Sequence, residues 1–216
     1  MPNVLDDKFV GFDKIGRPIK VTRYFKLCAK SIKACDMYQW WQWNFRCVEE
    51  MVNVVFPYCS KRAGKRIDQF VLIHDMGDCD MTPLIKDSEL RKYCESASQI
   101  GQECYPELMG QLWFVNAPAM FTTLWAFAKM FLSAKTLQKT KIFGKKHNFN
   151  EELCKELGKE NLPDFLGGDI PNFETHEMPW TKFLNHCVEK KTFYPNNENI
   201  CSDPLVKAQE FDFNRC

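Results

Sequence analysis

A run of four apolar residues at 70–73, Phe-Val-Leu-Ile, constrains the fold of this chain more than any other feature. The run contains no polar residue and ends at the polar pair His74 and Asp75. Short strands of this kind are covered on both faces, as in parallel sheets flanked by helices. Apolar residues at helical spacing over about 37–58 and 90–104 supply such helices. The pattern predicts an α/β domain built in layers around a largely parallel sheet.

Further elements are expected on both sides of this strand. We predict strands at 18–22, 112–115 and 141–143, and helices at 120–132, 149–158 and about 180–189. The segment 11–18, which contains Gly and Pro, is expected to be a turn. The chain has 216 residues, enough for one domain with its own core. We assign residues 1–168 to that domain and residues 169–216 to a C-terminal extension that packs on it.

Charge and cysteine content narrow the class of protein. The formal net charge is +1, whereas general nucleic-acid binders carry a basic excess, so no nucleic-acid partner is expected. The 11 cysteines form no Cys-x-x-Cys motif, no leader-like apolar segment follows Met1, and there is no Asn-x-Ser/Thr sequon. These features predict a cytosolic protein with reduced thiols. A secreted, disulfide-linked protein is the alternative.

The predicted helix at 120–132 is more apolar than a helix that only rests on a sheet. Its apolar side chains cover an arc of about 220°, whereas contact with a sheet needs about 100° or slightly more. Thr122, Lys129 and Ser133 form a narrow polar stripe. Either the tail after Asp169 covers this helix, or the helix lines a lipid-sized cavity with one side and meets a membrane with the other.

An uncharged stretch at 111–128 approaches the length of a membrane-spanning helix. Asn116 and Pro118 interrupt it. We therefore expect a strand followed by a helix here, and no transmembrane segment.

Motifs of the common enzyme classes are absent from the sequence. There is no GxSxG, HExxH or GxGxxG, and Arg17-Pro18 stands where a phosphate-binding P-loop needs Lys-Ser/Thr. The four His residues show no metal-ligand spacing. His74 and Asp75 form either an acid/base pair or a structural hydrogen-bonded pair at a strand end. We expect no enzyme activity, no metal site and no resident cofactor.

A family resemblance emerges from several motifs in order. These motifs are Tyr105-Pro106-Glu107, Gly110, Val115-Asn116-Ala117-Pro118, Phe121, Trp125, Lys129-x-Phe131-Leu132, Thr136, Asn161-Leu162-Pro163 and Gly167-Gly168, with Gly11 to Pro18 and Ile73-His74-Asp75 upstream. Together they resemble the CRAL-TRIO lipid-binding domain, and in particular the secretory-pathway phosphatidylinositol transfer proteins. The resemblance runs from about residue 9 to residue 168.

The resemblance implies a three-layer fold in which helices flank a mixed, mostly parallel five-stranded sheet and enclose one phospholipid. It makes the apolar segment at about 118–134 a gating helix, with Trp125 over a tunnel whose polar end lies at Glu107. The residues expected to form the apolar pocket and its gate are Phe70, Leu72, Trp113, Val115, Phe121, Leu124, Trp125, Phe127, Ala128 and Phe131.

The headgroup residues implied by the resemblance are Glu107, Thr136 and Lys139. An ammonium and a hydroxyl suit a phosphodiester, and a carboxylate can accept hydrogen bonds from ring hydroxyls. Lys141 lies close enough in sequence to compete with Lys139 for this assignment. The alternative is that Lys135, Lys139, Lys141, Lys145 and Lys146 form a solvated basic face, which would also attract anionic lipid.

Two departures from the family pattern affect the expected ligand. Phe70 and Leu72 stand where the dual-specificity members have small hydroxyl residues for phosphatidylcholine, so that lipid is disfavoured and a sterol fits better as a second ligand. The small helical module that usually precedes the domain is absent before residue 9, which implies weaker phosphoinositide binding. The chain is either a short natural form or part of a longer protein.

The resemblance implies a monomeric cytoplasmic protein that binds phosphatidylinositol, transfers it between membranes and presents it to a lipid kinase. Contact with membranes would be peripheral and transient. The alternative is a module that senses lipid or regulates a small GTPase or kinase without moving lipid. In that case the basic segments at 61–66 and 135–146 would dock an acidic partner.

Overall fold

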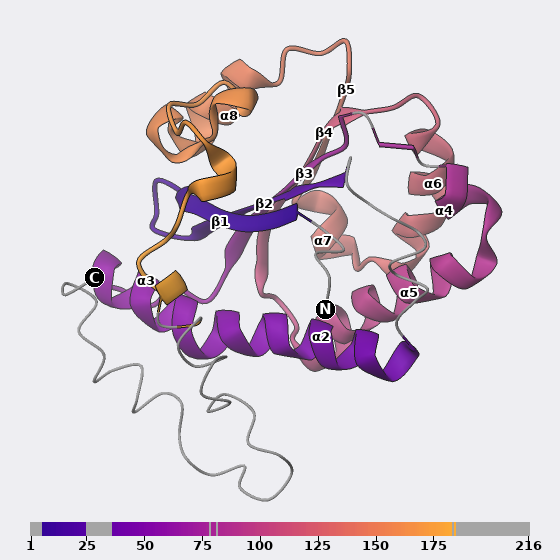
Figure 1. The fold of residues 1–216 in the computed structure, drawn as a ribbon, viewed down its shortest axis with the longest axis horizontal. Helices are drawn as coiled ribbons and strands as arrows, with labels where there is room; N and C mark the ends of the chain where they lie inside the picture. The colour runs from indigo at the N-terminus through magenta and orange to yellow at the C-terminus, as the bar shows by residue number, and fades with distance from the viewer. Residues whose placement is uncertain (1–5, 25–35, 78, 81, 183, 185–216) are drawn as a thin grey trace, which may run out of the picture.

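The computed structural model describes residues 6–24, 36–77, 79–80, 82–182 and 184. Its centre is a five-stranded sheet in the order β1-β2-β3-β4-β5 (Figure 1). The strands are β1 (Asp6–Phe12), β2 (Pro18–Arg23), β3 (Phe70–Asp75), β4 (Met109–Ala117) and β5 (Thr140–Gly144). The first two pair antiparallel and the others pair parallel, which confirms the predicted mixed sheet. Strand β1 was not predicted.

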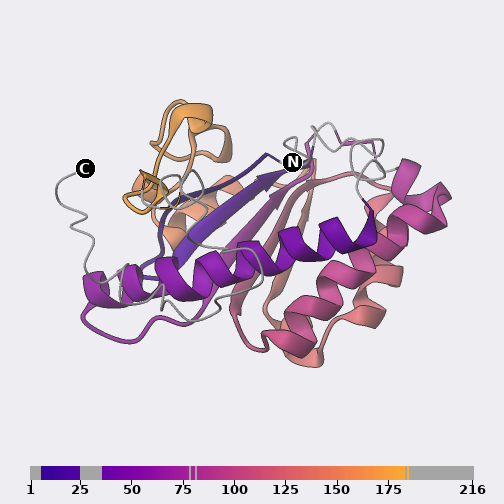
Figure 2. The same cartoon turned by 60° about the horizontal axis from the view of Figure 1, so that its bottom comes forward.

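Helices cover both faces of the sheet. They are α2 (Met37–Glu50), α3 (Phe56–Ala63), α4 (Thr82–Lys86), α5 (Ser88–Gln99), α6 (Phe121–Ala128), α7 (Ala134–Gln138) and α8 (Asn150–Leu157). Helices α2 and α3 run across one face, whereas α8 lies over the opposite face (Figures 1 and 2). The predicted α/β layers are therefore confirmed.

Two helices change their winding along their length. A π-helical segment, Met51–Val55, joins α2 to α3 without a break, and a second one, Ile100–Cys104, extends α5. Asp36 caps the start of α2, because its carboxylate accepts the backbone N–H of Gln39 at 2.8 Å. Gly64, in the left-handed conformation, ends α3.

The two faces of the sheet are set by strand register. Ile73 pairs with Trp113, and Asp75 pairs with Val115, so these side chains share one face. Trp113 and Val115 are fully buried in the core that packs against α8. The prediction that these two residues line the same pocket as Phe70 and Leu72 is therefore wrong, because side chains alternate along a strand and the two pairs point to opposite faces.

The opposite face carries Phe70, Leu72 and Phe114. Met51, Val54 and Phe56 of the long helix pack near Phe70 in a second core cluster. The third cluster joins α2, α5 and α6 around Trp40, Leu90, Tyr93 and Phe121. This face is the one that holds the candidate site.

The segment after residue 168 contributes to both main cores. Phe173 is buried against the α8 side. Trp180 is 1% exposed and meets Phe12 and Tyr58 edge-on, with ring centroids 5.8 and 5.2 Å away. Residues 185–216 lie outside the described part of the chain, as does most of the helix predicted near 180–189.

The predicted gating helix consists of α6 and a short 3-10 turn, Lys129–Phe131. Phe121 is buried, and Trp125 is half-buried; both rings pack on Phe114 with centroids 5.0 and 5.5 Å away. The side chains of Leu124, Phe127, Ala128 and Phe131 lie outside the described part. Within the described ranges, none of the helices combines the length and the apolar character needed to cross a bilayer.

Candidate functional site

A pocket of about 270 Å³ opens between α5, α7 and the beginnings of β3 and β4. Its inner part is apolar and its mouth is polar. The lining residues are Val48, Met51, Phe70, Ala97, Ser98, Gly101, Gln102, Tyr105, Pro106, Glu107, Leu108, Met109, Leu132, Ser133, Lys135, Thr136 and Lys139. Both π-helical segments contribute, through Met51 and Gly101, so the helices depart from regular winding at the pocket wall.

The three predicted headgroup residues meet in this pocket. Glu107 lies in the loop before β4, Thr136 lies in α7, and Lys139 follows the last residue of α7. Ser133 caps α7, because its hydroxyl accepts the backbone N–H of Thr136 at 3.1 Å. The Oγ atoms of Ser133 and Thr136 are 2.9 Å apart. The short helix thereby presents Thr136 and Lys139 to a loop that is about 30 residues earlier in the chain.

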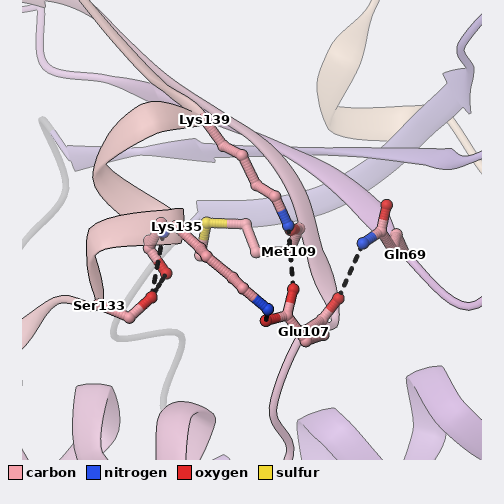
Figure 3. Close-up of polar contacts among 7 residues, drawn as sticks. Gln69, Glu107, Met109, Ser133, Lys135 and Lys139 are labelled. Atoms are coloured by element: carbon pink, nitrogen blue, oxygen red, sulfur yellow. Dashed lines mark hydrogen bonds and ion pairs between the residues drawn. The ribbon is translucent and has the colours of Figure 1, made fainter.

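Glu107 is held from both its backbone and its side chain (Figure 3). Its φ angle is 65°, in the left-handed region, and its carbonyl accepts Gln69 Nε2 at 3.1 Å. Lys135 Nζ donates to Glu107 Oε1 at 2.8 Å, and Lys139 Nζ donates to Glu107 Oε2 at 3.3 Å. Lys139 Nζ also donates to the Met109 carbonyl at 3.1 Å.

The charges at the mouth stabilise one another. Hydrogen bonds from Lys135 and then Lys139 lower the pKa of Glu107 below its ordinary value. The hydrogen bond to Glu107 raises the pKa of Lys135. At neutral pH the mouth therefore carries one carboxylate and two ammonium groups, an arrangement suited to an anionic oxygen ligand.

Lys135 was not among the predicted headgroup residues. It stands four positions before Lys139, so the two side chains share one side of α7 and of the residue that follows it. This four-residue spacing is the sequence signal that could have identified Lys135 as a neighbour of Lys139. Its contact with Glu107 depends on the position of α7 against the loop before β4, which spacing alone does not give.

Lys141 is directed to the other side of the sheet. Its Nζ donates to Glu152 at 2.8 Å and also to Glu156, both on α8. It lies 4.4 Å from the centre of the Trp113 ring. Of the two lysines that the sequence left open for the headgroup, Lys139 lines the pocket and Lys141 does not.

Tyr105 anchors the loop that carries Glu107. Its hydroxyl donates to the Glu49 carboxylate of α2, and burial, followed by this contact, raises the pKa of Tyr105. Its ring meets Phe45 edge-on at a centroid distance of 6.1 Å. The loop is thus tied to the long helix on one side and to α7 on the other.

Of the predicted apolar residues on this side of the sheet, one lines the pocket. Phe70 lines the pocket, and Leu72 lies two positions further along the same strand face without lining it. Phe121 and Trp125 pack with Phe114 away from the pocket. The pocket volume of about 270 Å³ lies just below the range of about 300–1,000 Å³ that ligand sites occupy, and it suits a headgroup rather than a whole phospholipid. The tunnel expected beneath Trp125 is not part of it.

His74 and Asp75 do not form a hydrogen-bonded pair. The Asp75 carboxylate accepts Asn116 Nδ2 at 2.8 Å and the Gly77 backbone N–H at 3.0 Å. The His74 ring instead lies on the opposite sheet face, stacked on Phe114 at 5.1 Å, and its Nδ1 is buried with no hydrogen-bond partner among the described residues. The sequence interpretation of an acid/base or structural pair is therefore wrong, because neighbouring residues in a strand point to opposite faces.

Comparisons with known proteins agree with the fold. A family model described as the CRAL/TRIO domain matches residues 9–168. The chain is 30% identical over 206 residues to the phosphatidylinositol/phosphatidylcholine transfer protein SFH11 of Arabidopsis thaliana, which corresponds to 92% of this chain and 53% of that protein. It is 30% identical over 155 residues to the Sec14 cytosolic factor of Schizosaccharomyces pombe, 71% of this chain and 52% of that protein.

A solved structure gives the same fold. The crystal structure of Sfh5 aligns with a TM-score of 0.63 and 17% identity, over 89% of this chain and 65% of that one. The present chain spans about half the length of the two curated relatives. Since the family model covers most of the sequence and the architecture agrees, this chain belongs to the CRAL/TRIO domain family.

Proposed function

We propose that this chain binds a phospholipid and moves it between membranes, with phosphatidylinositol as its ligand. The observation that carries the proposal is the convergence of Glu107, Thr136 and Lys139 on one pocket with an apolar inner wall. The A. thaliana relatives are named phosphatidylinositol/phosphatidylcholine transfer proteins, which supports phospholipid transfer, whereas the choice of phosphatidylinositol rests on the pocket residues.

Each group at the pocket mouth has a role in this proposal. The Lys139 ammonium and the Thr136 hydroxyl bind the phosphodiester, with the charge-assisted contact contributing most. The Glu107 carboxylate accepts hydrogen bonds from inositol hydroxyls, which are uncharged donors. Phosphatidylcholine lacks these hydroxyls, and the Phe70 side chain in the pocket offers it no hydrogen bond.

The acyl chains would occupy the sheet face that α6 now covers. Burying a methylene contributes about 0.8 kcal/mol, so two acyl chains require roughly 20 kcal/mol or more of apolar contact to leave a membrane. The present pocket is too small to supply it, so binding requires α6 to move away from Phe114 and to close again over the chains. Phe121 and Trp125 are the contacts that this gating motion breaks.

The proposal extends to the setting in which the chain works. A monomer in the cytoplasm would touch membrane surfaces transiently, collect phosphatidylinositol and present it to a lipid kinase. No covalent step, metal or resident cofactor enters this scheme. A sterol remains the proposed second ligand, since a sterol needs little hydrogen bonding from the strand face at Phe70 and Leu72.

A vesicle-to-vesicle assay with labelled phosphatidylinositol tests the proposal. The unmodified chain should transfer the lipid, and Lys139→Ala should slow transfer at least about tenfold, because a hydrogen bond to a charged group contributes about 1.5–3 kcal/mol and about 1.4 kcal/mol corresponds to a factor of ten. Lys155→Ala, an exposed lysine on α8 across the sheet, is the matched control and should transfer normally. Equal rates for Lys139→Ala and the control would refute the headgroup assignment. A chain that moves no lipid but binds an acidic protein would instead be an interaction module.

A further inference from the structure

We propose that Lys135 gives the pocket its preference for a headgroup with one net negative charge over a zwitterionic headgroup. The inference rests on the proposed function and identifies a residue that selects among lipids. It follows from the charge of the pocket lining and from the different ways in which the two lysines are held.

The side chains that line the pocket carry a net charge of +1. Among the lining residues of the described part, Lys135 and Lys139 are the bases and Glu107 is the acid. A phosphodiester with an uncharged polyol carries one negative charge, so it neutralises this set. With Lys135 removed, the lining would be neutral, so a zwitterionic headgroup would be matched in net charge and an anionic headgroup would leave one negative charge uncompensated.

The two lysines differ in how firmly they are held. The Lys139 side chain is 29% exposed and its Nζ contacts both Glu107 and the Met109 carbonyl. The Lys135 side chain is 71% exposed and, in the described structure, its Nζ contacts Glu107 alone. Lys135 can therefore turn toward an incoming phosphodiester while Glu107 keeps its contact with Lys139. Figure 3 shows the two amines approaching the carboxylate from separate positions.

The same arrangement opposes a zwitterion. A quaternary ammonium entering the mouth would meet two ammonium groups, and like charges at an interface suppress binding of the wrong partner. Glu107, the one carboxylate among the described lining residues, could attract it but already binds both lysines. Lys135 thus adds attraction for the phosphodiester and repulsion for the choline group.

Competitive loading measures this selectivity. The chain is incubated with vesicles that contain equal amounts of labelled phosphatidylinositol and phosphatidylcholine, and the bound ratio is determined. Lys135→Ala should lower the ratio about fivefold, the effect of about 1 kcal/mol that one lysine contributes beside anionic lipid. Lys135→Arg should restore most of it, since Arg keeps the charge. Lys155→Ala removes the same charge from α8 and should leave the ratio unchanged.

Two further arms separate the explanations. Soluble glycerophosphoinositol carries the same phosphodiester but lacks acyl chains, so it should compete with phosphatidylinositol only at far higher concentration. Competition at equal concentration would refute a lipid as the ligand that supplies the phosphodiester. An unchanged ratio in Lys135→Ala, or an equal fall in Lys155→Ala, would refute the role of Lys135 while phosphatidylinositol transfer stands. A chain that loads neither lipid would overturn both this inference and the proposed function.

Discussion

The indole of Trp180 meets the ring of Phe9 edge-on with centroids 5.5 Å apart, which joins a residue outside the family-matched segment to the first strand of the sheet. The fold therefore uses side chains beyond residue 168 as core. Trp180 closes the cluster formed by the long helix and β1.

Replacement of Trp180 tests this dependence. Trp180→Ala should lower the free energy of unfolding by about 3–5 kcal/mol, because a large buried ring is lost and a cavity remains. Trp41→Ala, at a residue that is 45% exposed, is the control and should change it by less than about 1 kcal/mol. Urea denaturation of the two variants gives the comparison. Equal losses would mean that Trp180 is not part of the core.

The backbone at Glu107 permits stability and ligand binding to be separated. Its φ of 65° suits glycine and disfavours a β-branched residue. Glu107→Val should be less stable than Glu107→Gly by about 1–2 kcal/mol. Both variants lack the carboxylate and should bind phosphatidylinositol weakly and to a similar degree. Chemical denaturation and lipid loading measure the two properties, and tight binding by the glycine variant would exclude a ligand role for the carboxylate.

Acid should destabilise the fold through His74. Burial, followed by the nearby Lys20 ammonium, lowers the pKa of His74 to about 3. The unfolded chain binds a proton at this residue below about pH 6.5, whereas the folded chain does not until near pH 3, so stability falls as the pH drops through that window. The slope approaches about 1.36 kcal/mol per pH unit.

His74→Phe provides the control for that slope, since Phe keeps a ring against Phe114 but cannot titrate. Urea midpoints measured from pH 7 to pH 4 should fall less steeply for the variant than for the unmodified chain. Parallel curves would show that the folded chain protonates His74 over the same pH range as the unfolded chain, so that its pKa is not lowered by folding.

The strand positions 70 and 72 should control phosphatidylcholine exchange. Phe70→Ser combined with Leu72→Thr places hydroxyls on the strand face next to the pocket and should raise phosphatidylcholine transfer several-fold. The double variant Phe70→Ala and Leu72→Ala creates similar space without hydroxyls, so it separates hydrogen bonding from volume. The assay is vesicle transfer of labelled phosphatidylcholine, and equal gains in both double variants would attribute the effect to space alone.

Most of the fold was predictable because its signals are local. The apolar run at 70–73 and the helical spacing at 37–58 correspond to β3 and to the helix around α2. The sheet face on which Trp113 lies was not predictable. Residues 112–115 are all apolar, and such a strand has no alternation of polar and apolar residues that distinguishes its two faces. Strand β1 has the sequence DDKFVGF, which shows little periodicity and is stabilised by pairing with β2.

The candidate site was predictable in part for a related reason. Glu107, Thr136 and Lys139 could be predicted together because each lies in a sequence motif that resembles the family pattern. The contact of Lys135 with Glu107 depends on the angle at which α7 meets the sheet, and the contribution of Trp180 depends on the path of the chain after residue 168. Neither quantity is contained in the spacing of residues.

The two π-helical segments, Met51–Val55 and Ile100–Cys104, also affect how this chain tolerates changes in length. A π turn holds one residue more than a regular turn, so deleting a single residue there restores ordinary winding and leaves the flanking turns in phase. The same deletion elsewhere in α2 or α5 would rotate one end of the helix by about 100° relative to the other. Variants of this domain that lack one residue in either π-helical segment should therefore still fold, although the shape of the pocket wall would change.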